Sequence, residues 1–102
     1  MENINKKSQE ELSSTVISKL DHLLDNSLIS GPEFGGLRDS IASVKNIINN
    51  EFVPDKDNKE IVDRAVNKLI ALIDNPELSE QKFLLIRSAI GSILNIVNND
   101  LN

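Results

Sequence analysis

Four segments of this chain repeat apolar side chains at intervals of three and four residues, and this spacing restricts the fold more than any other feature. An α-helix turns once every 3.6 residues, so side chains at this spacing lie along one helical face. No segment shows the two-residue alternation of a half-buried strand. The pattern therefore predicts an all-α protein. In the first segment the apolar face consists of Leu12, Val16, Leu20, Leu23 and Leu24.

Capping signals set the starts of the predicted helices. In a capping box, the first residue accepts a hydrogen bond from the backbone three positions on, and a glutamate there bonds back. Three pairs have this spacing: Ser8 with Glu11, Ser30 with Glu33, and Asp57 with Glu60. Ser79 is the expected cap of the fourth helix, and an asparagine stands near each predicted helix end. The predicted helices cover residues 8–26, 31–50, 58–74 and 80–98.

The four predicted helices have similar lengths and are joined by short connections, which favour antiparallel packing of successive helices. We therefore predict an antiparallel up-down-up-down four-helix bundle that occupies residues 8–102 as a single domain. Residues 1–7 are predicted to form a flexible N-terminal tail. Apart from the shared capping pattern, we predict no internal repeat.

Composition excludes several classes of function. The chain has no cysteine, which excludes a disulfide framework and a thiolate zinc site. Its net charge is −5, and its Lys and Arg residues are too scattered to form the basic stripe of a nucleic-acid-binding domain. The N-terminal residues lack an apolar signal core, and no run of apolar residues is long enough to span a bilayer. We expect a cytoplasmic protein with at most peripheral membrane association.

Candidate catalytic and metal-binding residues are few. His22 is the one histidine, and a catalytic role would need a nucleophile or an orienting acid from elsewhere in the fold. We interpret it as a half-exposed residue at the edge of the apolar face. The acidic stretch from Asp55 begins like a calcium-binding loop, but Lys59 and Glu60 stand where an oxygen ligand and a glycine are required. We predict no enzymatic activity, no metal and no cofactor.

The fourth predicted helix is the most apolar segment, because only Arg87 is charged between Phe83 and Val97. A helix that is apolar on most sides is either deeply buried or partly exposed as a docking surface. For Leu84, Leu85 and Ile96 both interpretations stay open. Gly91 is interpreted as a site where a neighbouring helix approaches closely. One face is predicted to be core, and it contains Ile86, Ile90, Ile93 and Val97.

Residues 48–91 read INNEFVPDKDNKEIVDRAVNKLIALIDNPELSEQKFLLIRSAIG. This segment resembles the immunity proteins that protect bacteria from class IIa, pediocin-like bacteriocins, especially the enterocin A immunity type. The resemblance lies in a polar, proline-containing link followed by two helices. Its residues are the Arg64, Val66 and Leu69 stripe, the Ser79-Glu80 helix opening, and the Leu85-Ile86-Arg87 step.

The resemblance implies a protein that acts by binding rather than by catalysis. Members of that family are thought to act at the inner face of the membrane, on the complex between the bacteriocin and the mannose phosphotransferase permease. Their C-terminal half governs which bacteriocin is resisted. Carried onto this chain, the expected partner-binding residues are Leu84, Leu85, Arg87, Asn95, Ile96, Asn98, Asn99 and Leu101. The alternative is a generic helical interaction module, such as a phage-type regulator or an antitoxin-like partner.

Overall fold

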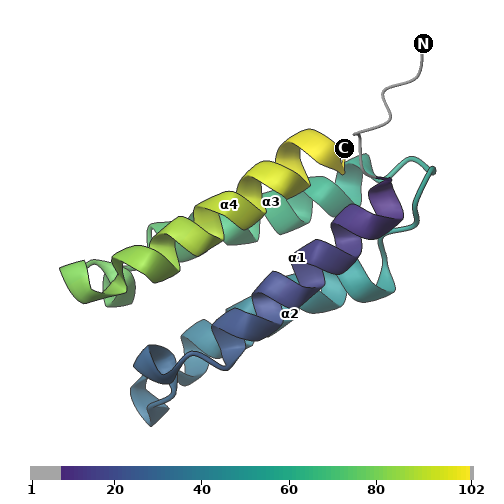
Figure 1. Ribbon diagram of the computed structural model, residues 1–102. Helices are drawn as coiled ribbons and strands as arrows, with labels where there is room; N and C mark the ends of the chain where they lie inside the picture. The colour runs from purple at the N-terminus through teal and green to yellow at the C-terminus, as the bar shows by residue number, and fades with distance from the viewer. Residues whose placement is uncertain (1–7, 102) are drawn as a thin grey trace.

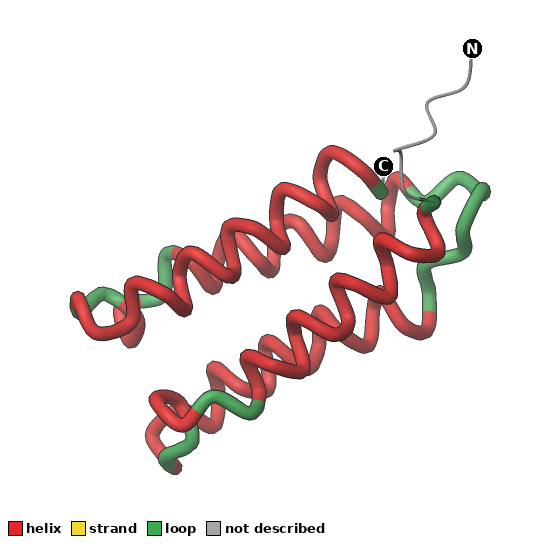
Figure 2. The backbone as a smooth tube through the Cα atoms, in the orientation of Figure 1, coloured by secondary structure: helices red, strands yellow, loops and turns green. Residues whose placement is uncertain are grey.

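The computed structural model describes residues 8–101 and confirms the all-α fold class, with four α-helices and no strand in that range (Figures 1 and 2). Figure 1 shows α1 and α2 as one antiparallel hairpin and α3 and α4 as a second. The start of α1, the end of α4 and the α2–α3 connection lie at the same end of the bundle. The helices are α1 (Gln9–Leu24), α2 (Gly35–Asn50), α3 (Lys59–Ile73) and α4 (Leu84–Asp100).

Each helix contributes one apolar face to a single core between the hairpins. Burying a Leu, Ile or Val side chain contributes about 1.5–3 kcal/mol, so this core is the main source of stability. Within the hairpins α1 packs on α2 and α3 on α4, and between them α1 packs on α4 and α2 on α3. The fully buried residues include Val16, Leu20, Ile41, Val44, Val62, Leu69, Ile90 and Ile93.

The predicted capping box at the start of α1 is confirmed. The backbone N–H of Glu11 donates to the Ser8 hydroxyl at 3.1 Å, and the Ser8 N–H donates to Glu11 Oε1 at 3.4 Å. The predicted start of α3 is close, but its box does not form. Instead, Asp57 Oδ1 accepts from the Lys59 N–H at 3.1 Å, while the side chain of Asn58 turns into the connection.

The predicted caps at Ser30 and Ser79 are wrong, because each serine ends a short 3-10 turn instead. Their hydroxyls donate backwards, to the carbonyls of Ser27 at 2.9 Å and Pro76 at 2.8 Å. Two consecutive 3-10 turns therefore precede α2 and α4, which begin later than the sequence predicts. The turns are η1 (Ser27–Ile29), η2 (Pro32–Phe34), η3 (Pro76–Leu78) and η4 (Gln81–Phe83).

The prediction that the chain has no internal repeat is also wrong. A shift of 49 residues, the interval between Arg38 and Arg87, aligns the turn and the second helix of the first hairpin with those of the second. Between residues 23–52 and 72–101, twelve of thirty positions are identical. The identical positions, each matched 49 residues later, are Leu23, Asp25, Asn26, Ser30, Phe34, Arg38, Ile41, Ser43, Asn46, Ile47, Asn49 and Asn50.

The same shift relates the hydrogen bonds of the two hairpins. Arg38 Nη1 donates to the carbonyls of Ile29 and Gly31, at 2.6 and 2.7 Å. Arg87 Nη1 donates to the two residues found 49 positions later, the carbonyls of Leu78 and Glu80. Asn26 and Asn75 likewise cap η1 and η3 with their side chains. We call residues related by this shift mates, and the chain is therefore a pair of equivalent hairpins.

Candidate functional site

The first turn of α4 carries Leu85, the most exposed large apolar side chain of the described residues, next to the partly exposed Leu84. The predicted core face is confirmed, because Ile86, Ile90, Ile93 and Val97 are all buried. Leu84 is 45% exposed and Leu85 is 81% exposed. These two leucines lie on the surface, so the interpretation of deep burial is wrong for them. Ile96 is half-buried and packs against the core.

The predicted partner-binding residues do not form one surface. Leu84 and Leu85 lie at the start of α4, whereas the exposed Asn95, Asn98 and Asn99 lie towards its end. At a rise of about 1.5 Å per residue, Leu85 and Asn98 are roughly 20 Å apart along the helix. The two groups would therefore contact different parts of a partner.

Leu101 is not available as a contact residue, so that prediction is wrong. Its side chain is only 1% exposed and belongs to the core. The physical reason is that α4 continues to Asp100, past its predicted end at residue 98, and brings Leu101 back onto the bundle. Its mate Phe52 is buried in the same way after α2. Both side chains close the core at the end of a hairpin.

Arg87 is held by the turn before α4 rather than presented to a partner. The guanidinium is half-buried and donates to the carbonyls of Leu78 and Glu80, and the bond to Glu80 measures 2.9 Å. Its mate Arg38 makes the equivalent pair of bonds in the first hairpin. Because both halves need this arrangement, we assign Arg87 to closing the turn.

Comparison of mates shows that the exposed leucines are not required by the fold. The mates of Leu84 and Leu85 are Gly35 and Gly36, which begin α2 in the same structural position. A Cβ atom added at either glycine would meet nothing within 4 Å. The first hairpin therefore reaches the same fold with no side chain at these positions. A hairpin of this fold therefore does not depend on leucine side chains at these two positions.

A second difference between mates also gives the second hairpin apolar side chains, here where the first hairpin has charged ones. In the first hairpin Lys45 Nζ pairs with Asp21 Oδ1 at 2.6 Å. The mates of this ion pair are Leu94 and Ile70, and Ile70 is 44% exposed. An exposed ion pair contributes at most about 1 kcal/mol, so its replacement changes the character of the surface more than the stability. At these two positions the second hairpin thus has the more apolar side chains.

A shallow groove of about 250 Å³ lies between α1 and α4 beside Leu85. It is smaller than the roughly 300–1,000 Å³ of typical small-molecule sites. Its size suits a single side chain of a protein partner better than a cofactor. We call it the α1–α4 groove, and its lining residues are Lys19, His22, Leu23, Asn26, Leu85, Ile86 and Ala89.

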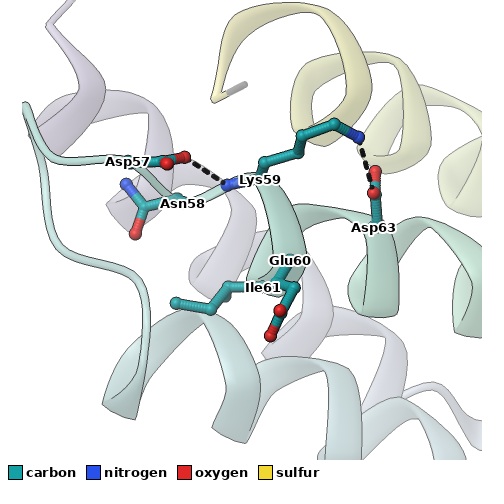
Figure 3. Close-up of a pocket in the computed structure, with 6 residues that line it drawn as sticks. All are labelled: Asp57, Asn58, Lys59, Glu60, Ile61 and Asp63. Atoms are coloured by element: carbon teal, nitrogen blue, oxygen red, sulfur yellow. Dashed lines mark hydrogen bonds and ion pairs between the residues drawn. The ribbon is translucent and has the colours of Figure 1, made fainter.

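A larger hollow, of about 560 Å³, lies at the start of α3 (Figure 3). Its carboxyl groups do not converge: Figure 3 shows Asp57, Glu60 and Asp63 pointing in different directions. Asp63 Oδ2 pairs with Lys59 Nζ at 3.0 Å, and Asp57 caps the helix. Among residues 8–101, no group of three or more His, Cys, Asp or Glu side chains is placed to hold a metal ion.

Asn58 is the buried polar side chain of the α2–α3 connection, residues 51–58. Asn58 is 5% exposed, and its Oδ1 accepts from the Val53 N–H at 3.0 Å. Its Nδ2 donates to the carbonyls of Val53 at 2.7 Å and Lys56 at 3.0 Å. Asp55 adopts a left-handed backbone with φ of 65°, which lets the connection reverse tightly. The side chains described at this end of the bundle stabilise the connection. We therefore take the start of α4 as the candidate site.

Two charged residues beside this connection have shifted pKa values. A hydrogen bond from Arg64 lowers the pKa of Glu51, and the same bond raises the pKa of Arg64. Both groups are exposed and lie far from α4's first turn along the bundle. They join the end of α2 to α3 and are not part of the candidate site.

His22 is exposed and lines the α1–α4 groove beside Lys19.

Across the described residues 8–101, no helix is both long enough and apolar enough to cross a membrane. Neither protein-family models, nor curated proteins, nor solved structures match the chain. The candidate site therefore stands on its geometry: two exposed leucines at the start of α4, next to a side-chain-sized groove.

Proposed function

We propose that this chain is a protein-binding module that acts without catalysis and contacts its partner through Leu84 and Leu85. The observation that carries the proposal is Leu85, which is 81% exposed at a position where the other hairpin has glycine. An exposed leucine contributes about 1.5–3 kcal/mol when a partner buries it. Two adjacent leucines beside a groove supply apolar surface that a partner can remove from water.

We further propose that the binding role is immunity to a pediocin-like bacteriocin, exerted in the cytoplasm on the bacteriocin–permease complex. The support for this role is the resemblance of residues 48–91 to that family. The Leu85-Ile86-Arg87 step of the resemblance coincides with the candidate site. In this role Leu85 contacts the partner, Ile86 anchors the helix in the core, and Arg87 holds the turn.

The test is protection of a sensitive strain against a panel of pediocin-like bacteriocins. We expect the wild-type chain to protect against at least one of them. The double variant Leu84→Gly, Leu85→Gly carries the glycine pair of the first hairpin and should lose protection while its circular dichroism stays helical. The matched control is Val53→Ser, which removes an exposed apolar side chain at the opposite end of the bundle. Protection by this control should be unchanged.

The outcomes separate the two levels of the proposal. Equal killing with and without the wild-type chain, across the whole panel, would refute the immunity role. Protection that survives the double glycine variant would refute the binding surface. If the immunity role is refuted, the alternative of a regulator or antitoxin-like module remains. A partner that binds the wild-type chain but not the double glycine variant would support that alternative.

A further inference from the structure

We infer that the chain is a duplicated helical hairpin packed as a fused homodimer, and that its paired hairpin faces accept a second copy of this chain. This inference is independent of the proposed function, because it concerns the faces between the hairpins and not the exposed leucines. It starts from the twelve identical mates between residues 23–52 and 72–101. The shared capping pattern alone cannot account for them, because they include core and turn-closing residues.

The packing between the hairpins has the symmetry that a homodimer would have. In a twofold-symmetric interface, each contact between two elements recurs between their counterparts. Under the 49-residue shift, the α1–α4 contact becomes the α3–α2 contact, and both are present. Core residues follow the same rule, since Leu20 and its mate Leu69 are both fully buried.

The contact between Phe34 and Phe83 shows where the twofold axis between the two hairpins lies. They are mates, and their rings touch edge to face with centroids 5.7 Å apart. A residue can contact its own counterpart only where it lies next to the twofold axis. The aromatic contact therefore marks the axis at the turn end of the bundle, and both hairpins present the same face to it.

The connection at residues 51–58 decides whether the two hairpins pair within one chain or between two chains. It is the covalent link between the two hairpins, and α2 and α3 are antiparallel only because it reverses the chain. A short linker gives its two ends an effective concentration of the order of millimolar. At micromolar chain concentrations the hairpins therefore pair within the chain. If the link is prevented from reversing, the same faces must find a second copy.

The principal experiment replaces residues 53–58 by six helix-forming residues, Ala-Glu-Ala-Ala-Lys-Ala, so that α2 continues into α3. A continuous helix directs the second hairpin away from the first, and we expect a complex of at least two chains by light scattering. The wild type has a chain mass of 11.3 kDa. The control inserts six Gly and Ser residues after Val53, which keeps the reversal possible, and should retain the wild-type mass. A helix-locked variant that remains a single chain would overturn the inference.

A second measurement uses the unmodified chain, so the inference does not depend on how the locked variant folds. Equal amounts of nitrogen-15-labelled and unlabelled protein are unfolded together and refolded at about 1 mM, near the effective concentration of the link. Native mass spectrometry should then detect dimers with both labels, and these should be absent after refolding at a hundredfold lower concentration. Monomers alone at both concentrations would contradict the exchange of hairpins.

Discussion

Replacing Arg38 or its mate Arg87 by alanine should destabilise the protein by nearly the same amount. Each guanidinium uses Nη1 to bond two carbonyls that belong to the 3-10 turns before its helix. These bonds connect each hairpin's turn to the first turn of the helix that follows it. Their loss should therefore loosen the turn without removing any core side chain.

The size of the effect follows from the number and setting of the bonds. A hydrogen bond with a charged partner contributes about 1.5–3 kcal/mol when it is well buried. Here both arginines are half-buried, and the carbonyls can regain water once the guanidinium is gone. We therefore expect a loss of about 1.5–2 kcal/mol in the free energy of unfolding for each arginine. Because the two arginines make equivalent pairs of bonds, the two losses should be similar.

The assay is chemical denaturation of the full chain, followed by circular dichroism at matched pH and salt. For a domain of this size, each kcal/mol corresponds to about 4–8 °C in Tm, so a thermal scan provides a second reading. The control is Lys45→Ala, which breaks an exposed ion pair worth at most about 1 kcal/mol. A large loss for one arginine and none for the other would refute the equivalence of the two hairpins.

Four further outcomes follow from the structure. Ile90→Ala should cost about 2–5 kcal/mol by urea denaturation, because the side chain is fully buried; a loss below about 1 kcal/mol would contradict that burial. Gly36→Ala should stabilise by about 0.5–1 kcal/mol in thermal scans, since a Cβ meets no atom there. Asn58→Ala should cost about 1–3 kcal/mol by urea denaturation, because it removes three part-buried hydrogen bonds to the backbone of the connection. Because the pKa of Glu51 is lowered on folding, its ionised form stabilises the folded state above pH 4.5, the ordinary value of its pKa. This contribution disappears as the pH falls through the folded-state pKa. Glu51→Gln should therefore flatten that part of the curve of unfolding free energy against pH.

Much of the fold could be predicted from the sequence, because helical periodicity reports directly which side chains are buried. The face of Ile86, Ile90, Ile93 and Val97 was predicted from spacing alone and is buried throughout. The capping box at Ser8 was predicted from two residue types at fixed spacing and forms as expected. Both features are local, so neighbouring residues determine them without help from the rest of the chain.

Features that depend on the whole chain were missed. Ser30 and Ser79 stand where the sequence predicts helix N-caps. However, the preceding asparagines begin 3-10 turns, and the serine hydroxyls donate to backbone carbonyls of those turns. Gly91 was interpreted as a site of close helix approach, yet an added Cβ would meet nothing within 4 Å. At the two serines a local 3-10 turn replaces the cap, whereas at Gly91 the distance of the neighbouring helices decides the outcome.

The internal repeat had a signal in the sequence that could have been found. The stretch from Ile41, IASVKNIINNEF, aligns without gaps with the stretch from Ile90, IGSILNIVNNDL. Comparing the chain with itself at a 49-residue shift would have identified Arg38 and Arg87 as mates. It would also have separated Leu84 and Leu85, which differ from their mates, from Arg87, which does not. The candidate site is thus partly readable from the sequence, as the difference between two halves that share a fold.

The most direct test of the binding surface is site-specific photocrosslinking in the producing cell at position 85 and at its mate, position 36. The two positions occupy the same place in equivalent hairpins, so they differ in local surface rather than in fold. We expect a crosslinked partner from position 85 only, identified by mass spectrometry and lost when Leu84→Gly is added. Equal crosslinking from both positions, or none from position 85, would contradict the assignment of the first turn of α4 as the contact surface.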